Sequence, residues 1–288
     1  MLNDSIVRAT LSRVRRLRLR SVRERTGLHF IEGFRAVLQA LDAGIPIETF
    51  VYSEILAQNA AVQKKVRLSK RAGTPVVRVS PEEFRRVSLT PHASGIGAIA
   101  RQHWTPLEEA DPRLGLSWVA VRVIRSPGNL GTLLRTAEAA GAGGIVLLGD
   151  AIDLFDPAVV RASMGGLFHL RLVRASLEAF ASWTRARGCT IVGTSPHAES
   201  LHTTVPVDPP LVLLFGDERK GLSPAELAVC THRARIPFVG RADSLNVAVA
   251  SGVMLYEVAR RRDYFSGFAS AKPDFLSSSN PDLSGRTS

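Results

Sequence analysis

The sequence predicts an α/β protein with two parts, a C-terminal domain built on a parallel sheet and a smaller N-terminal α/β domain. From residue 117 onward, short apolar strands alternate with helical segments, and strands that are apolar throughout are those covered by helices on both faces. A length of 288 residues suits about two domains, and 45% hydrophobic residues can fill two cores. A polar, Pro-containing stretch at 102–116 separates the two patterns and predicts a linker.

The first predicted element is a basic helix. Residues 8–25 hold eight arginines against one acid, Glu24, and apolar residues recur between them at helical spacing. A charged run of this kind is often only a solvated helix face, and an organellar transit peptide is a weaker alternative. Contact with RNA phosphates is the more specific hypothesis. The arginines that we expect to make it are Arg15, Arg16, Arg18 and Arg20.

The rest of the N-terminal domain, which we expect to span residues 1–101, alternates helices with strands. Residues 29–45 predict a strand or loop followed by a helix that Gly44 ends, and a second helix ends at Gly73. Ser80, followed by Pro81, starts a third helix. Further strands are predicted at 47–53, 75–80 and 95–101.

The C-terminal domain, predicted at 117–263, alternates more strictly, and its apolar runs are short enough for buried strands. Its predicted strands cover 118–124, 144–149, 170–173, 189–195 and 211–216. Helices are predicted at 130–140, 157–164 and 176–187, with two more after the last strand. Residues 264–288 are rich in Ser and poor in large apolar groups, which predicts a disordered tail.

Composition limits the partners and the compartment. A formal net charge of +11 favours binding to polyanions, with nucleic acid as the first candidate. The two cysteines form no disulfide framework and have no metal-ligand spacing with histidines, so we expect a reducing compartment, the cytoplasm, and no metal. No apolar run is long enough to span a membrane, and no apolar signal segment follows the start, so we expect no membrane partner.

Three Gly-containing loops follow predicted strands and precede helices. They are RSPGNLGTLLR at 125–135, LLFGDERKGLS at 213–223 and RIPFVGRADSLNVAVASG at 235–252. Glycine at such places lets the backbone approach a ligand, and ligands of open parallel sheets lie at the carboxyl ends of strands. One such loop is weak evidence, but the three together are specific.

These loops resemble the three motifs of the SpoU/TrmH family, within the SPOUT class of RNA 2′-O-ribose methyltransferases. The resemblance spans about residues 117 to 260. The segment FIEGFR at 30–35, together with GIGAI at 95–99, resembles the substrate-binding domain of such enzymes, a fold similar to a small RNA-binding ribosomal protein. One position departs from the family, which commonly has Asp where this chain has Ser126. The residues that carry the resemblance are Asn129 and Arg135 in the first loop, Glu218 in the second, and Ser244, Leu245 and Asn246 in the third.

The resemblance implies a deep trefoil knot that binds S-adenosylmethionine, with catalytic roles for Arg135, Asn129, Glu218, Ser244 and Asn246. It implies that Arg135 acts on the ribose as a base, although a guanidinium with a pKa above about 12 suits positioning and alkoxide stabilisation better. Arg35 is implied to contact RNA. The residues implied to hold the cofactor are Thr194, Gly216, Ile236, Leu245 and Arg161.

Each of these residues also has a purely structural interpretation. Arg135 lies off the apolar stripe of its predicted helix and could pair with Glu138. Asn129 precedes that helix as expected for an N-cap, and Ser244 could cap the last helix, with Asn246 just inside it. Glu218 could be a surface acid that pairs with the adjacent cations, Arg219 or Lys220.

We therefore expect an S-adenosylmethionine-dependent 2′-O-methyltransferase of a structured RNA, ribosomal RNA rather than tRNA. A catalytically silent RNA-binding protein of the same fold is the alternative. A nucleotide-binding oxidoreductase is disfavoured, because GAGG at 141–144 follows a helix rather than a strand. The apolar helix at 246–259 must be covered on nearly every side, which together with the resemblance predicts a homodimer.

Overall fold

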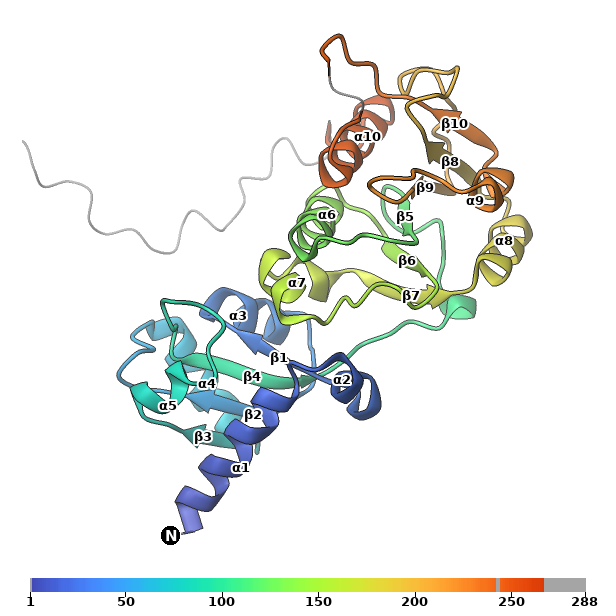
Figure 1. Cartoon of the computed structure of the whole chain (residues 1–288). Helices are drawn as coiled ribbons and strands as arrows, with labels where there is room; N and C mark the ends of the chain where they lie inside the picture. Colours follow the sequence, from blue (N-terminus) through green and yellow to red (C-terminus); the bar gives the residue numbers. More distant parts are fainter. Residues whose placement is uncertain (1, 242–243, 267–288) are drawn as a thin grey trace, which may run out of the picture.

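The computed structural model describes residues 2–241 and 244–266 and contains two sheets (Figure 1). The N-terminal sheet has the order β1-β4-β2-β3. Strand β4 is antiparallel to β1 and β2, whereas β2 and β3 are parallel. Its strands are β1 (Leu28–Glu32), β2 (Ile47–Tyr52), β3 (Val76–Arg78) and β4 (Ile96–Arg101). Its helices are α1 (Leu2–Arg16), α2 (Arg20–Thr26), α3 (Phe34–Asp42), α4 (Ala60–Arg71) and α5 (Pro81–Arg85).

The basic N-terminal segment is part of the folded domain. The prediction of one helix was wrong, because the chain breaks between α1 and α2 at residues 17–19. The apolar side of the segment is buried in a cluster beneath the sheet, with Val14 1% and Leu17 3% exposed. Most of its arginines face solvent, but Arg23 is only 2% exposed. The segment therefore supplies core side chains as well as surface charge.

The C-terminal sheet has six strands in the order β10-β8-β9-β5-β6-β7, and every neighbouring pair is parallel. Strand β10 was not predicted. The strands are β5 (Trp118–Val121), β6 (Gly144–Leu148), β7 (Arg171–Ala175), β8 (Thr190–Thr194), β9 (Leu211–Phe215) and β10 (His232–Ala234). The helices are α6 (Pro127–Ala139), α7 (Pro157–Ala162), α8 (Leu177–Ala186), α9 (Pro224–Val229) and α10 (Val247–Arg261), with the 3-10 turns η1 (Leu107–Glu109) and η2 (Gly166–His169).

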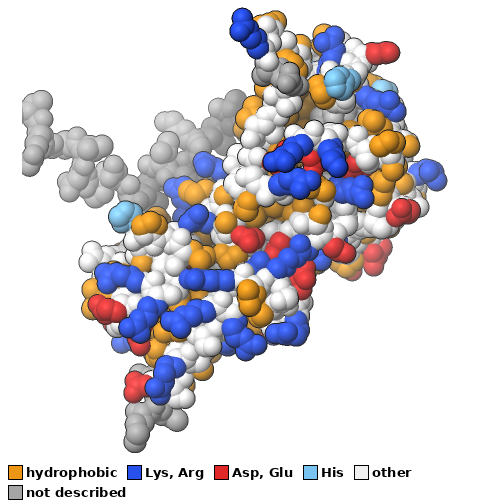
Figure 2. Space-filling model, in the orientation of Figure 1, with side chains coloured by type: hydrophobic (Ala, Val, Ile, Leu, Met, Phe, Trp, Pro, Cys, Tyr) orange, Lys and Arg blue, Asp and Glu red, His pale blue; other side chains and the backbone are white. Residues whose placement is uncertain are grey.

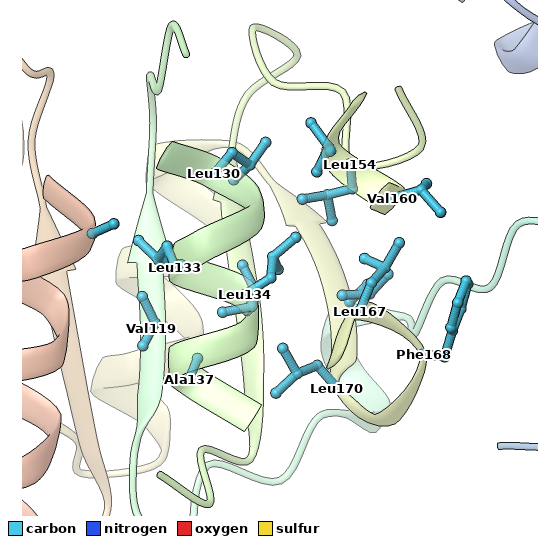
Figure 3. Close-up of a cluster of buried hydrophobic side chains, with 14 of the residues drawn as sticks. Val119, Leu130, Leu133, Leu134, Ala137, Leu154, Val160, Leu167, Phe168 and Leu170 are labelled. Carbon is cyan, nitrogen blue, oxygen red and sulfur yellow. The ribbon is translucent and has the colours of Figure 1, made fainter. Parts of the chain in front are cut away.

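Helices cover both faces of this sheet. In β5 the side chains alternate, so that Val119 and Val121 face α6, α7 and α10, whereas Trp118 and Ala120 face α8 and α9. Leu130, Leu133, Leu134 and Ala137 of α6 are buried at helical spacing. Figure 3 shows them between β5 and the segment around α7 and η2. This packing fixes how α6 presents its first turn at the edge of the sheet.

The two domains share a continuous apolar cluster, so their junction is a packed interface. His29 of β1 lies 4.7 Å, between ring centroids, from Phe155, which follows β6. The buried Arg23 pairs with Asp153 and donates through Nη1 to the carbonyl oxygen of Leu17 at 2.6 Å. A buried ion pair and packed rings therefore set the orientation of the domains.

The end of the described chain is packed. Tyr264, in the predicted tail, lies against the core cluster, and a Cβ atom at Gly141 would approach its ring to 2.9 Å. Residues 267–288 of the predicted tail lie outside the described residues. Within residues 2–241 and 244–266, no helix is long and apolar enough to cross a membrane.

Candidate active site

The three Gly-containing loops meet at the carboxyl ends of β5, β9 and β8–β10. The chain runs from β5 outward to β6 and β7 on one side, and β9, β8 and β10 lie on the other. Such a change of direction leaves a crevice at the carboxyl ends of the strands, which is where open parallel sheets bind ligands. Two adjoining pockets of about 460 Å³ and about 1360 Å³ lie here.

The smaller pocket contains the polar residues that were predicted to be catalytic, except Arg135. It lies at the start of α6. Its walls are Arg125, Ser126, Asn129, Glu218, Arg219, Ser244, Leu245, Asn246 and Val247. Residues from all three loops therefore share one site.

Ser126 is the N-cap of α6, so the prediction that Asn129 caps this helix was wrong. The Ser126 Oγ accepts a hydrogen bond from Asn129 N at 3.3 Å. A short hydroxyl caps a helix about as well as Asp, so the departure from the family at this position keeps the capping function. Because capping does not require Asn129, its side chain is available for other contacts.

Asn129 joins the second and third loops through its amide. Its Nδ2 donates to Oε1 of Glu218, and its Oδ1 accepts from Nδ2 of Asn246 at 2.9 Å. Glu218 Oε2 accepts from the backbone N–H of Arg125 at 3.2 Å. The three side chains thus form one hydrogen-bonded chain across the pocket wall.

Asn246 anchors the far end of this chain. Its Oδ1 accepts from Ala248 N at 2.9 Å, which makes it the N-cap of α10. The expectation that Asn246 lies inside the helix was therefore wrong, and so was capping by Ser244, which precedes it in the exposed loop. Since Asn is a preferred N-cap, one residue both starts α10 and holds Asn129.

The second loop is a tight turn organised by Asp217. Its Oδ1 accepts from the backbone N–H groups of Arg219 at 2.8 Å and Lys220 at 3.0 Å. These hydrogen bonds, with Arg125 beside the carboxylate, hold the pKa of Asp217 below its usual range. Gly216 starts the turn, where a Cβ atom would lie 2.2 Å from the carbonyl carbon of Gly221. Only glycine fits at this approach, and the turn directs Glu218 towards Asn129.

The larger pocket brings together most of the residues predicted to hold the cofactor. Thr194, Gly216, Ile236 and Leu245 all line it. Its floor is tightly packed, because a Cβ atom at Gly193 would lie 2.4 Å from Sγ of Cys230. Small-molecule sites typically enclose about 300–1,000 Å³, so the pocket has room for a nucleoside with an extended chain.

Two predicted site residues lie elsewhere. Arg161 lines neither pocket, and its Nη1 instead donates to the carbonyl oxygen of Leu89 across the domain junction at 3.2 Å. Arg135 also lies outside both linings and is exposed on α6. Within the described residues it makes no hydrogen bond or ion pair, so the alternative pair with Glu138 is absent.

The predicted RNA-contacting arginines lie on the surface of the N-terminal domain, and Figure 2 shows Lys and Arg side chains spread over the region of α1, α2 and α5. Arg18 donates to the carbonyl oxygen of Val87 at 2.9 Å, and Arg20 pairs with Glu24 at 2.8 Å. Arg15, Arg16 and Arg35 are exposed. Arg18 and Arg20 therefore also serve the fold, whereas the other three face solvent.

Three residues of the site were missed from the sequence: Arg125, Asp217 and Arg219. Arg125 and Asp217 are 92 positions apart, and no local pattern predicts their contact. The run of charges at 217–220 was the available signal. Among the described residues, no group of His, Cys, Asp and Glu side chains is placed to hold a metal ion.

Comparison with known proteins identifies the family. Residues 117–256 match the SpoU rRNA Methylase family, and residues 9–98 match the MRM3-like substrate binding domain. The chain is 31% identical to a 23S rRNA (uridine(2479)-2′-O)-methyltransferase from Streptomyces viridochromogenes, over 84% of this chain and 86% of that protein. The chain belongs to the SpoU rRNA methylase family. It is also 28% identical to the 23S rRNA (guanosine(2553)-2′-O)-methyltransferase RlmP from Bacillus subtilis, over 85% and 93% of the two chains.

Solved structures of SpoU proteins have the same fold across both domains. An AdoMet-bound rRNA methyltransferase from Sinorhizobium meliloti has a TM-score of 0.80 and 37% identity, over 88% of this chain and 94% of that one. The SpoU methyltransferase AviRb from Streptomyces viridochromogenes, in complex with AdoMet, has a TM-score of 0.79 and 28% identity, over 87% and 98%. The predicted fold class and the family resemblance are confirmed.

Proposed function

We propose that this SpoU protein transfers a methyl group from S-adenosylmethionine to a ribose 2′-hydroxyl of ribosomal RNA. The observation that carries the proposal is the hydrogen-bonded chain from Glu218 through Asn129 to Asn246, which lines the smaller pocket beside the larger one. It joins all three family loops at one point. The two relatives described above are named for the same 2′-O reaction on 23S rRNA, at a uridine and at a guanosine, so the base itself stays open.

The larger pocket fits the cofactor. Gly216 lets the backbone of its loop close against Gly221, and Thr194, Ile236 and Leu245 would surround the adenosine and methionine parts. S-adenosylmethionine, when bound, supplies an activated methyl group on a positively charged sulfur. The family also implies the knot expected from the resemblance. We therefore assign this pocket to cofactor and the smaller pocket to the target ribose.

The protein's own contribution is orientation. Both carboxylate oxygens of Glu218 already accept hydrogen bonds, so Glu218 holds Asn129 in place rather than receiving the hydroxyl proton. Asn129 and Asn246 fix the wall against which the ribose would lie. Methyl transfer requires the hydroxyl oxygen and the methyl group to be held in line, and such positioning supplies much of the rate enhancement.

Arg135 is assigned to the substrate. It is exposed and free of partners among the described residues, as a group that waits for a polyanion would be. Its planar fork suits a ribose or phosphate oxygen and would stabilise the developing alkoxide. Arg135 lines neither pocket of one chain, so it would reach the target ribose only when RNA or a second copy of the chain is bound.

A homodimer would supply that second copy. Helix α10 buries one face but leaves Val249 53% and Tyr256 49% exposed, and Phe265 lies 5.6 Å from Tyr256 between ring centroids. Such a patch on the domain next to the site is typical of an interface between copies. Light scattering at micromolar concentration should give twice the chain mass.

The expected cytoplasmic location and the domain boundaries at 101 and 117 stay predictions.

The test is incubation of the purified protein with labelled S-adenosylmethionine and total RNA, followed by mapping of the modified ribose. We expect label at one 2′-oxygen of ribosomal RNA. Gly216→Ala should lose cofactor binding, because its Cβ atom would collide with the backbone of Gly221. Label on tRNA would show that the substrate is tRNA rather than ribosomal RNA. Binding of RNA without cofactor binding or transfer would favour the silent RNA-binding protein.

A further inference from the structure

The proposed reaction assigns no role to two arginines at the smaller pocket. Arg125 ends the strand-to-helix connection before α6, and Arg219 follows Glu218 in the second loop. Both guanidinium groups border the pocket that holds Asn129 and Asn246. Neither is among the residues that the family resemblance assigns to the site.

Asp217 holds the Arg125 side chain in place but leaves some of its N–H donors unpaired. Its Nε lies 3.2 Å and its Nη2 3.1 Å from the same oxygen, Oδ2 of Asp217. The Arg125 side chain is 57% exposed, and Nη1 makes no hydrogen bond within the described residues. A guanidinium has five N–H donors, and bidentate anion binding needs only two of them. Arg125 therefore lines the pocket with donors that no described group uses.

Arg219 is positioned by its backbone and free at its side chain. Its N–H is fixed by Oδ1 of Asp217 at 2.8 Å. The side chain is exposed and makes no ion pair or hydrogen bond among the described residues, yet Arg219 lines both pockets. An arginine on a rigid turn, with an unpaired head group, is pre-organised for an anion.

The unpaired N–H donors at the smaller pocket favour a phosphate. Its lining contains Arg125 and Arg219 against one carboxylate, Glu218, whose two oxygens accept from Asn129 and from the Arg125 backbone. The Asp217 charge is stabilised by the turn and by Arg125. Asp217 pairs with Arg125, so the two arginines meet two carboxylates in all, and the attraction for a phosphate comes from the unpaired N–H donors of Arg125 and Arg219.

We propose that Arg125 and Arg219 form a clamp for the RNA backbone phosphate that flanks the methylated ribose. This inference rests on the proposed function, because it places the ribose against Asn129. The 2′-carbon is bonded to the 3′-carbon that carries the next phosphate, so a ribose held at Asn129 has a phosphate beside it. Asp217 holds Arg125 in the absence of RNA, and the free donors of Arg125 turn to the phosphate when RNA enters. The clamp contacts no base, and by holding the phosphate it aligns the 2′-hydroxyl with the methyl group of the cofactor.

The test compares Arg219→Ala and Arg125→Ala with Arg185→Ala, a control that removes the same charge from an exposed position on α8. We expect the slope of log affinity for ribosomal RNA against log salt to fall by about 0.7 to 0.9 for each clamp variant, as for loss of one phosphate contact. The control should change the slope less. The RNA KM should rise about tenfold in the clamp variants, while affinity for S-adenosylmethionine stays at the parental value.

Arg219→Ala is the decisive variant, because its side chain holds no other described part of the protein. A parental salt slope in Arg219→Ala would overturn the clamp, as would an equal loss in Arg185→Ala. If Arg125→Ala alone loses cofactor binding, Arg125 is a support of the Asp217 turn and the clamp is overturned for that residue. A parent that binds RNA but transfers no methyl group contradicts the proposed function, and the salt slopes still decide the clamp.

Discussion

The domain junction and the active site both depend on arginines and polar side chains, but they place them in opposite surroundings. At the junction Arg23 is 2% exposed and bound to Asp153 and to a backbone carbonyl. At the site the Arg125 side chain is 57% exposed, and Arg219 is exposed as well. A buried charge is stable only when its partners are in place. An exposed guanidinium has N–H donors that a ligand can bind.

The contrast extends to the groups that lack partners. His29 is buried and His103 is half-buried at the junction, and their buried ring nitrogens make no well-aligned hydrogen bond among the described residues. At the site, in contrast, the amides of Asn129 and Asn246 are linked to each other and to Glu218. The junction therefore combines packed rings with one buried ion pair, and the site gains its order from a polar network.

The largest expected effect is on catalysis by Arg135. Arg135→Ala should lower methyl transfer on the order of a thousandfold, as for loss of one transition-state donor, while S-adenosylmethionine still binds. Arg135→Lys keeps the charge but loses the planar fork, and we expect nearly the same loss. Initial rates with labelled cofactor and calorimetric titration of cofactor measure the two properties.

The lysine variant sharpens the comparison. Substantial activity in Arg135→Lys would mean that charge alone suffices and that bidentate geometry does not matter. An alanine variant close to the parental rate would remove Arg135 from the reaction and leave it an ordinary surface arginine.

The second effect is on folding, at the junction. Arg23→Ala should lower the free energy of unfolding by about 3 kcal/mol, because it leaves Asp153 without its buried partner. Urea unfolding measures the change. Arg25→Ala on the same helix, where the side chain is exposed, is the matched control and should change stability little.

A double variant separates pairing from packing. Arg23→Met combined with Asp153→Asn removes both charges, so it should recover part of the loss. If the double variant is no more stable than Arg23→Ala, the aliphatic contacts of Arg23, rather than its charge, hold the domains together.

The sequence predicted the parallel sheet and the meeting of the three loops, because wholly apolar strands and glycines at strand ends are local signals. It failed where a contact joins distant residues. Asn129 was expected to cap α6, but Ser126 does so and Asn129 reaches Asn246 instead. Arg23 was counted with the basic face because it is one of the eight arginines at 8–25, and its partner Asp153 lies 130 positions away. Short β10 has only three residues, too few for a clear pattern.

The third effect is a pH dependence that arises at the junction. Burial lowers the pKa of His29 from 6.5 to about 3, with further lowering by nearby His103 and Arg23. The unfolded chain therefore binds a proton below about pH 6.5 that the folded chain does not, so stability falls as pH falls from there towards 3. Between about pH 7 and about pH 5, His29 should contribute a loss on the order of 2 kcal/mol.

His29→Phe tests this origin, since the ring keeps its packing against Phe155 and no longer titrates. Urea unfolding at the two pH values should show a smaller loss for the variant than for the parent. Some dependence should remain, because burial also lowers the pKa of His103. An equal loss in both proteins would place the titrating group elsewhere.

The smallest effect concerns the basic N-terminal segment. Deleting the segment would remove buried Val14 and Leu17, so point variants are the cleaner test. Arg15→Ala and Arg16→Ala each remove one exposed charge from α1 and should each reduce the salt slope of RNA binding by less than about 0.9. Stability and cofactor affinity should not change, because neither side chain makes a hydrogen bond or ion pair among the described residues. An unaltered slope in both variants would make these two arginines a solvated helix face, and RNA contact by the N-terminal domain would then depend on Arg18, Arg20 and Arg35.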